Sequence, residues 1–142
     1  YVGRNSYEKG IDILQEAESQ INGNIIYCTD RSWDDAMHII KSSSVVVVPS
    51  RTESLPTIIK EAFFLNIPVV ATNVGGIPEA VKNSDRCLMN PGDIDGLADR
   101  LESALYDSSF VTEPGFAIRS YEDMAQQVLE LTESAYRNFS QK

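Results

Sequence analysis

The chain has 142 residues, of which 42% are hydrophobic and 23% are charged. This length and this balance predict one compact domain with an ordinary core, and they exclude a disordered tail or a fibrous repeat. The net charge of −9, from 12 basic and 21 acidic residues, excludes a general field that would attract nucleic acid or an anionic membrane, so any bound phosphate must be held locally.

Short apolar runs alternate with helical patterns in the first half of the chain. Hydrophobic periodicity predicts a strand stub at residues 1–2, a helix at about 9–20, a strand at 24–28, a helix at 32–42 and a strand at 44–49. Ser32 is expected to cap the second helix, because its hydroxyl can accept a bond from a free backbone amide. Four consecutive valines in the last run indicate a strand that is covered on both faces.

The same alternation continues in the second half. The pattern predicts a helix at 54–65, a strand at 69–72, a turn-rich loop at 73–78 and a short helix from residue 79, then a strand at 87–89, a helix from Asp93 to Tyr106, a polar connector at 107–115 and a long helix at 120–139. Pro56 is expected in the first turn of the first of these helices, where its missing amide costs nothing. Asp93 is expected to cap the helix that follows it.

Strands that alternate with long helices indicate parallel crossover connections. We therefore predict an α/β fold, a single Rossmann-like domain with a parallel sheet flanked by helices. Ligands of such sheets bind at the carboxyl ends of the strands. The chemistry of this chain is expected in its strand-to-helix loops.

Three further features bear on cellular context. The longest apolar run, residues 45–48, is far shorter than the roughly 20 residues that span a bilayer, so we expect a cytoplasmic chain. The chain opens on Tyr1 in an apolar strand stub without an initiating Met, which suggests a domain of a longer polypeptide. Cys28 and Cys87 each lie in or beside an apolar run and are expected to be reduced core thiols rather than a disulfide or a metal pair.

The first candidate loop carries Arg4 and Lys9 between a strand and a helix start. Two fixed cations beside free helix amides can neutralise a diphosphate. The alternative is two solvated charges on a surface loop.

The second candidate is the stretch from Pro49 to Ala62, which holds Glu53 just before a helix and Glu61 inside it. At roughly 1.5 Å per helical residue, the two carboxylates lie on the order of 10 Å apart, too far for a shared proton. This spacing fits two carboxylates that grip different diols of one extended ligand, such as a sugar and a ribose. Glu61 could equally be a surface neighbour of Thr57.

The third candidate is Gly75–Gly76, where paired glycines permit either close approach to a ligand or a tight connection. Outside these loops, His38 is expected to be an exposed or structural histidine. Trp33 either packs on the sheet or shields the pocket of a nucleotide base, and packing is the favoured alternative.

Together these segments resemble the donor-binding half of a GT-B glycosyltransferase of the large retaining group, glycosyltransferase family 4. The resemblance rests on YVGRNSYEKGIDILQEA, on SSSVVVVPSRTESLPTIIKEAFFLNIPVVATNVGGIPEAV and on CLMNPGDIDGLADRL, and it covers residues 1 to about 106. It implies that the whole of residues 1–142 is the nucleotide-sugar donor-binding domain, the C-terminal half of the GT-B fold, and that an N-terminal acceptor domain is absent.

The resemblance also implies the role of each site residue. Arg4 and Lys9 would hold the donor diphosphate and stabilise charge as the nucleotide leaves, and Glu53 would accept bonds from the transferred sugar. Glu61 would bind the ribose diol. The remaining donor-binding positions implied are Ser50, Ser54, Leu55, Pro56, Thr57, Gly75 and Gly76.

As a function, the resemblance implies a hexosyltransferase (EC 2.4) that moves a hexose-type sugar from a nucleotide-diphosphate sugar to a glycan, lipid or other acceptor with retention. Polysaccharide and cell-envelope biosynthesis are the expected settings. No metal or other cofactor is expected, and the acceptor would bind in the cleft between the two domains. Any association with the inner face of the membrane would come through the absent domain. The isolated chain is expected to bind donor weakly and not to transfer sugar.

Departures and rivals stay open at this stage. Where many family members have Gly-Phe-Gly after the first glutamate, this chain has Ser54-Leu55-Pro56, which reshapes the sugar pocket. One half of a non-hydrolysing sugar-nucleotide epimerase is an alternative, as is a stand-alone nucleotide-sugar binding module. A receiver-type signalling domain is disfavoured, because Gly3-Arg4 and Val48-Pro49-Ser50 stand where its acids are needed.

Overall fold

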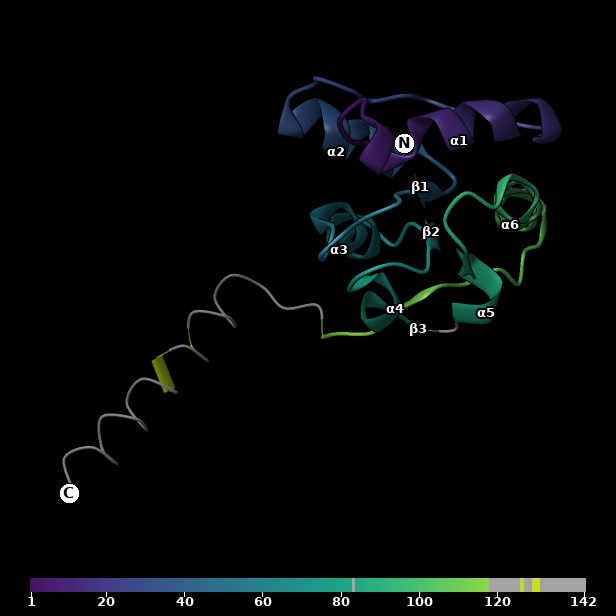
Figure 1. Ribbon diagram of the computed structural model, residues 1–142. Coiled ribbons are helices and arrows are strands. Elements are labelled where there is room, and N and C mark those ends of the chain that lie inside the picture. The colour runs from purple at the N-terminus through teal and green to yellow at the C-terminus, as the bar shows by residue number, and fades with distance from the viewer. Residues whose placement is uncertain (83, 118–125, 127–128, 131–142) are drawn as a thin grey trace.

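The computed structural model describes residues 1–82, 84–117, 126 and 129–130. Apart from residues 126 and 129–130, the helix predicted at 120–139 lies outside the described residues. The described chain is an α/β fold, as predicted, with a parallel three-stranded sheet flanked by helices (Figure 1).

The sheet consists of β1 (Val46–Val48), β2 (Val69–Thr72) and β4 (Leu88–Met89), in the order β1-β2-β4. Both pairings are parallel, and Val47 lies opposite Val70. Every residue of β1 and β2 is buried. The valine run is therefore covered on both faces, as its lack of polar alternation predicts.

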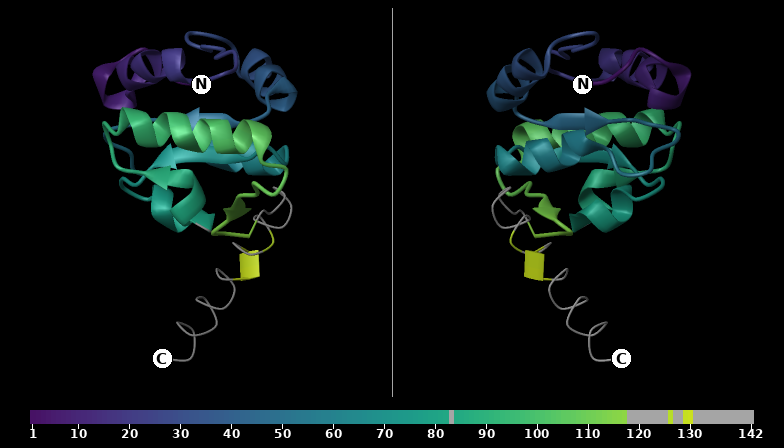
Figure 2. Two further views of the ribbon diagram at one scale, coloured as in Figure 1. Left: turned by 90° about the vertical axis from the view of Figure 1, so that its right-hand side faces the viewer. Right: turned by 90° about the vertical axis from the view of Figure 1, so that its left-hand side faces the viewer.

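Helices lie on both sides of this sheet. Figure 1 shows α3 (Thr57–Phe64) and α6 (Ile94–Tyr106) on opposite sides of β1 and β2, and both helices contact β2. α1 (Ile11–Ala17) packs against α6, and α2 (Trp33–Ser42) packs against α3, as the views of Figure 2 also show.

The helices with local capping signals begin where the sequence predicts. Ser32 precedes α2 and its hydroxyl accepts a hydrogen bond from the amide of Asp35. Asp93 precedes α6 and accepts from the amide of Gly96 at 2.9 Å. Each cap satisfies an amide that has no partner within the helix.

The prediction of one continuous helix at 9–20 is wrong. A 3-10 turn, η1 (Tyr7–Lys9), precedes α1, and a second one, η2 (Glu18–Gln20), follows it. Gly10 separates η1 from α1 with a φ of 67°, and a Cβ atom there would lie 2.0 Å from the carbonyl oxygen of Pro49. The turn at Gly10 thus follows from a tertiary contact with the loop after β1.

α3 begins at Thr57 rather than at residue 54, which corrects a second prediction. Pro56 is the residue before the helix and has extended backbone angles, so it does not lie in the first turn. The carbonyl of Ser54 accepts a 2.6 Å bond from the amide of Gly76, which holds this part of the chain as a loop.

Residues 24–28 do not form the predicted strand, because only a single parallel bridge joins Val2 and Cys28.

The connector predicted at 107–115 contains a strand that was not predicted, β5 (Glu113–Pro114), which pairs antiparallel with β3 (Val81–Lys82). The short helix α4 spans Ile77–Ala80 and so begins two residues earlier than predicted. α5 (Ser84–Cys87) takes up the first residue of the strand predicted at 87–89.

The core gathers the aliphatic side chains of the sheet and of the inner helix faces, and Cys28 and Cys87 are both buried. Within the part of the chain that the structure describes, no helix has the length and apolarity needed to cross a bilayer.

Candidate functional site

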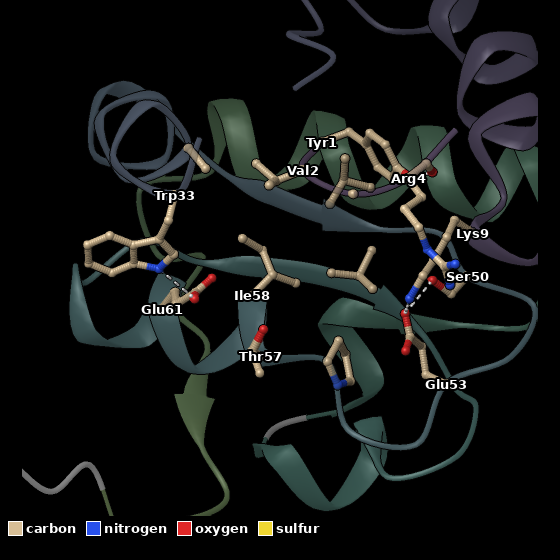
Figure 3. Close-up of a pocket in the computed structure, with 15 residues that line it drawn as sticks. Tyr1, Val2, Arg4, Lys9, Trp33, Ser50, Glu53, Thr57, Ile58 and Glu61 are labelled. Atoms are coloured by element: carbon tan, nitrogen blue, oxygen red, sulfur yellow. Dashed lines mark hydrogen bonds and ion pairs between the residues drawn. The ribbon is translucent and has the colours of Figure 1, made fainter. Parts of the chain in front are cut away.

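A cleft of about 340 Å³ opens at the carboxyl end of β1. Its walls come from residues 1–4, Lys9, the start of α2, the end of β1, and the loop and first turns that lead into α3 (Figure 3). The cleft therefore lies at the edge of the parallel sheet where ligands of this class of fold bind.

Most of the predicted site residues line this one cleft. They are Arg4, Lys9, Ser50, Glu53, Pro56, Thr57 and Glu61. Ser54, Leu55, Gly75 and Gly76 do not line it. The two cations and the two glutamates, which lie far apart in the sequence, are thus brought together by the fold.

Lys9 and Glu53 form an ion pair at one end of the cleft. Nζ of Lys9 lies 2.5 Å from Oε1 of Glu53, and the hydroxyl of Ser50 donates to the same oxygen at 3.0 Å. The Glu53 side chain is only 9% exposed. Ser50 is itself fixed, because the hydroxyl of Thr72 donates to its carbonyl at 2.6 Å. The carboxylate is therefore held in one place by two donors.

Arg51 clamps the loop of Lys9 to the loop of Glu53. Its guanidinium donates to both carboxylate oxygens of Asp12 at 2.7 Å and to the carbonyl of Tyr7 at 2.7 Å, and it lies 3.9 Å from the centre of the Tyr7 ring. Its amide also donates to the carbonyl of Glu8 at 2.8 Å. The bond from Arg51 lowers the pKa of Asp12. Planar, paired bonds of this kind fix orientation as well as distance.

The paired glycines support Glu53 from the other side. Gly75 has a φ of 53°, and a Cβ atom there would lie 1.6 Å from the carbonyl oxygen of Glu53. A Cβ atom on Gly76 would lie 2.3 Å from the carbonyl oxygen of Ser54. The glycine pair therefore forms a tight connection, in which glycine backbone packs against the loop that carries Glu53, and its predicted contact with the donor stays a prediction.

Arg4 lies at the same end of the cleft as Lys9 (Figure 3). The hydroxyl of Tyr1 donates to the Arg4 carbonyl at 2.5 Å and so holds its backbone. Burial, with a further contribution from the charge of Glu53, raises the pKa of Tyr1 to about 12, while Arg4 acts in the opposite direction. This hydroxyl accordingly stays protonated near neutral pH and keeps its donor role.

Trp33 and Glu61 lie at the other end of the cleft (Figure 3). The indole Nε1–H donates to Oε1 of Glu61 at 3.2 Å, and 66% of Trp33 is exposed. The favoured expectation that Trp33 packs on the sheet is therefore wrong. His38, in contrast, is exposed on α2 as expected, with its Nδ1 atom 2.8 Å from the carbonyl oxygen of Asp34.

The clamp at Arg51 was not predicted from the sequence, and the place of Trp33 in the cleft wall agrees with the less favoured of its two predicted roles. The clamp had a signal in the sequence, because Asp12 is close to Lys9 along the chain and Arg51 is close to Glu53. When the two loops pack together, Arg51 meets Asp12 and Lys9 meets Glu53. The signal for Trp33 was its place at a helix start next to the loop after Cys28.

No cluster of three potential metal-binding side chains occurs among the residues that the structure describes. The chain contains one Asp-x-Asp spacing, at Asp93 and Asp95, but neither residue lines the cleft. Asp93 caps α6, and Asp95 accepts a bond from Gln20 at 3.2 Å. This pair therefore has a structural role.

Comparison with known proteins gives one family match. The family model described as "Glycosyl transferases group 1" matches residues 1–107. The match contains every residue that lines the cleft.

Individual relatives agree with this match. The sulfoquinovosyl transferase SQD2 of Arabidopsis thaliana is 33% identical over 78 residues, which are 52% of this chain and 15% of that protein. TuaC of Bacillus subtilis (strain 168), provisionally named a teichuronic acid biosynthesis glycosyltransferase, is 27% identical over 146 residues, covering 89% of this chain and 37% of that protein. The D-inositol 3-phosphate glycosyltransferase of Rhodococcus jostii (strain RHA1) is 33% identical over 107 residues, covering 73% of this chain and 22% of that protein. The chain thus spans well under half the length of these relatives.

Proposed function

The chain belongs to the glycosyl transferases of group 1, and on that premise we propose that it is the donor-binding domain of a retaining glycosyltransferase of family 4 with the GT-B architecture. The reaction proposed is transfer of a hexose-type sugar from a nucleotide-diphosphate sugar to a glycan, lipid or other acceptor. The chain would supply the donor half of the active site.

One observation carries this proposal: a single cleft has cations at one end and a carboxylate beside an indole at the other. Arg4 and Lys9 suit a diphosphate, since both line the cleft near the carboxyl edge of the sheet. Glu61 suits a ribose diol, because a carboxylate can accept bonds from both hydroxyls. Glu53 lies at the cationic end and suits the hydroxyls of the transferred sugar.

The proposed reaction depends most on the two cations, Arg4 and Lys9. Sugar transfer leaves a growing negative charge on the diphosphate while positive charge develops on the sugar ring. Fixed donors aimed at the diphosphate stabilise that charge without reorganising, and such groups are worth several kcal/mol where water is excluded. Arg4 and Lys9 would do this without a metal.

Lys9 must change partners when the donor binds. Its ammonium is 2.5 Å from Oε1 of Glu53 in the structure. A diphosphate offers stronger charge at the same place, so Lys9 would turn toward it and Glu53 would turn toward the sugar. Ser50, which donates to Glu53 in the structure, would limit how far the carboxylate moves.

The acceptor would bind in a cleft between this domain and a second domain of a GT-B fold. One relative is named for teichuronic acid biosynthesis, which supports a polysaccharide acceptor of the cell envelope as the class we favour. Contact with the inner face of the membrane would come through the other domain. The family match favours a transferase over the epimerase half or the stand-alone binding module.

The experiment that tests this function is a transfer assay on the full-length protein. A panel of nucleotide-diphosphate sugars is supplied with lipid and glycan acceptors, and the anomeric configuration of the product is determined by NMR. The proposal requires retained configuration, and it requires that Lys9→Ala abolish most of the activity. Release of free sugar epimer in place of a glycoside would instead support the epimerase.

A further inference from the structure

Trp33 is the one tryptophan of the chain, and it stands at the start of α2 as a wall of the cleft. Large aromatic side chains gain free energy by burial, and tryptophan combines a large apolar face with one polar N–H group that seeks a partner. Tyr7, Phe64 and Tyr106 are also exposed, but none of them lines the cleft.

The indole is held in place by its edge. Its Nε1–H donates to Oε1 of Glu61, on the neighbouring helix, at 3.2 Å (Figure 3). A hydrogen bond in the plane of the ring does not occupy the ring faces. The bond also fixes the Glu61 carboxylate through one of its two oxygens. Trp33 and Glu61 thus form one unit at this end of the cleft.

The polarity of the cleft changes from one end to the other. Arg4 and Lys9 lie at one end, buried Ile58 lies between the ends, and Trp33 lies at the far end (Figure 3). A nucleoside diphosphate has the same order of chemistry: an anionic diphosphate, a ribose with a diol, and a flat aromatic base. A nucleoside diphosphate with its diphosphate at the cations and its diol at Glu61 would have its base next to the indole, because Trp33 is bonded to Glu61.

We infer that Trp33 is the stacking platform for the base of the donor nucleotide, and that its Nε1–H positions Glu61 for the ribose. The inference rests on the proposed function and adds the base-binding residue to it. Stacking on an aromatic ring tolerates different bases, because every base has a π-face. The platform therefore adds affinity for a nucleotide while the choice of base is made elsewhere.

Calorimetry on the 142-residue chain with two kinds of probe tests this. The first kind is uridine, adenosine or guanosine diphosphate, and the second is inorganic pyrophosphate, which has no base. Trp33→Ala is expected to weaken the best-bound nucleoside diphosphate about tenfold or more and to leave pyrophosphate affinity unchanged. Trp33→Phe keeps a ring without the N–H and is expected to lose less. Phe64→Ala removes an equally exposed ring outside the cleft and is expected to change neither affinity.

A second measurement uses Trp33 itself, because it is the sole tryptophan. Its fluorescence is expected to be quenched by the nucleoside diphosphate and not by pyrophosphate. The inference would be overturned if the wild type and Trp33→Ala bound the nucleoside diphosphate equally well, or if the nucleoside diphosphate did not quench Trp33 fluorescence more than pyrophosphate does. Either result would leave the proposed donor cleft intact. Equal loss of pyrophosphate affinity in Trp33→Ala would also overturn the inference. If neither probe binds the wild type, the proposed donor site fails and this inference fails with it.

Discussion

Nζ of Lys9 lies 2.5 Å from Oε1 of Glu53, although 44 positions separate the two residues in the sequence. Gly10 and Arg51 make this possible. Gly10 lets the loop of Lys9 approach Pro49, and Arg51 ties the loop of Glu53 to Asp12 and Tyr7. The pair neutralises a cation that the proposed reaction needs. Donor binding is therefore a competition between a phosphate and a carboxylate for one ammonium group.

Glu53→Gln tests this competition. The amide keeps the shape of the side chain and removes the negative charge beside Lys9, so we expect pyrophosphate to bind about fivefold more tightly, equivalent to about 1 kcal/mol for a partly exposed pair. Transfer by the full-length protein should nevertheless fall, because the sugar loses its charged acceptor. Calorimetry and the transfer assay give the two readings.

The matched control for Glu53→Gln is Asp107→Asn, which neutralises the partner of Arg86 in an ion pair away from the cleft. It should leave pyrophosphate binding unchanged. Weaker pyrophosphate binding by Glu53→Gln would mean that the carboxylate orders Lys9 rather than competing for it.

Gly75→Ala should destabilise the domain more than Gly92→Ala. Both glycines have positive φ angles, 53° and 82°, so each substitution carries about 1 kcal/mol of backbone strain. At Gly75 the new Cβ would also overlap the carbonyl of Glu53, whereas at Gly92 nothing lies within 4 Å. We expect an extra loss of about 1–3 kcal/mol at Gly75, measured by urea unfolding. Equal losses of unfolding free energy in the two variants would show that the Glu53 loop moves away from the new Cβ atom without destabilising the domain.

The clamp at Arg51 should be sensitive to acid. Its bond lowers the pKa of Asp12 in the folded chain, so its contribution to stability is present above the ordinary aspartate pKa of about 4 and is lost as the pH falls through the folded value. The difference in unfolding free energy between the wild type and Asp12→Asn should therefore shrink between pH 6 and pH 3. The Asp12 side chain is 44% exposed, so the difference at pH 6 should be below about 1 kcal/mol. A difference that grows on acidification would contradict this account.

Glu61→Ala should weaken nucleoside diphosphate binding by about 1–3 kcal/mol, as expected for loss of a charged acceptor. Pyrophosphate, which has no ribose, should bind as before. Glu79→Ala, an exposed glutamate outside the cleft, is the control and should change neither affinity. Unchanged affinity of Glu61→Ala for the nucleoside diphosphate would remove Glu61 from the ribose.

Elements with strong local signals could be predicted from the sequence. β2 has the predicted bounds because an unbroken apolar run suits a strand buried on both faces. α6 begins after Asp93 because its cap and its apolar stripe agree. β3 and β5, by contrast, are two residues each and pair across a long separation, so no local pattern reveals them.

The candidate site also has features that could be predicted from the sequence and features that could not. The gathering of Arg4, Lys9, Glu53 and Glu61 in one cleft was predictable, because the loops after parallel strands meet at one sheet edge. The exposure of Trp33 was not, because the direction of a side chain at a helix start depends on its neighbours in space.

The central claim is that one cleft grips an activated sugar by its diphosphate at Arg4 and Lys9 and by its ribose at Glu61. A crystal structure of the chain with a bound nucleoside diphosphate tests it most directly. The account predicts phosphate oxygens about 3 Å from the Arg4 and Lys9 side chains and ribose hydroxyls about 3 Å from Glu61. A nucleotide bound outside the cleft, or bound in the reverse direction with its phosphates at Glu61, would contradict it.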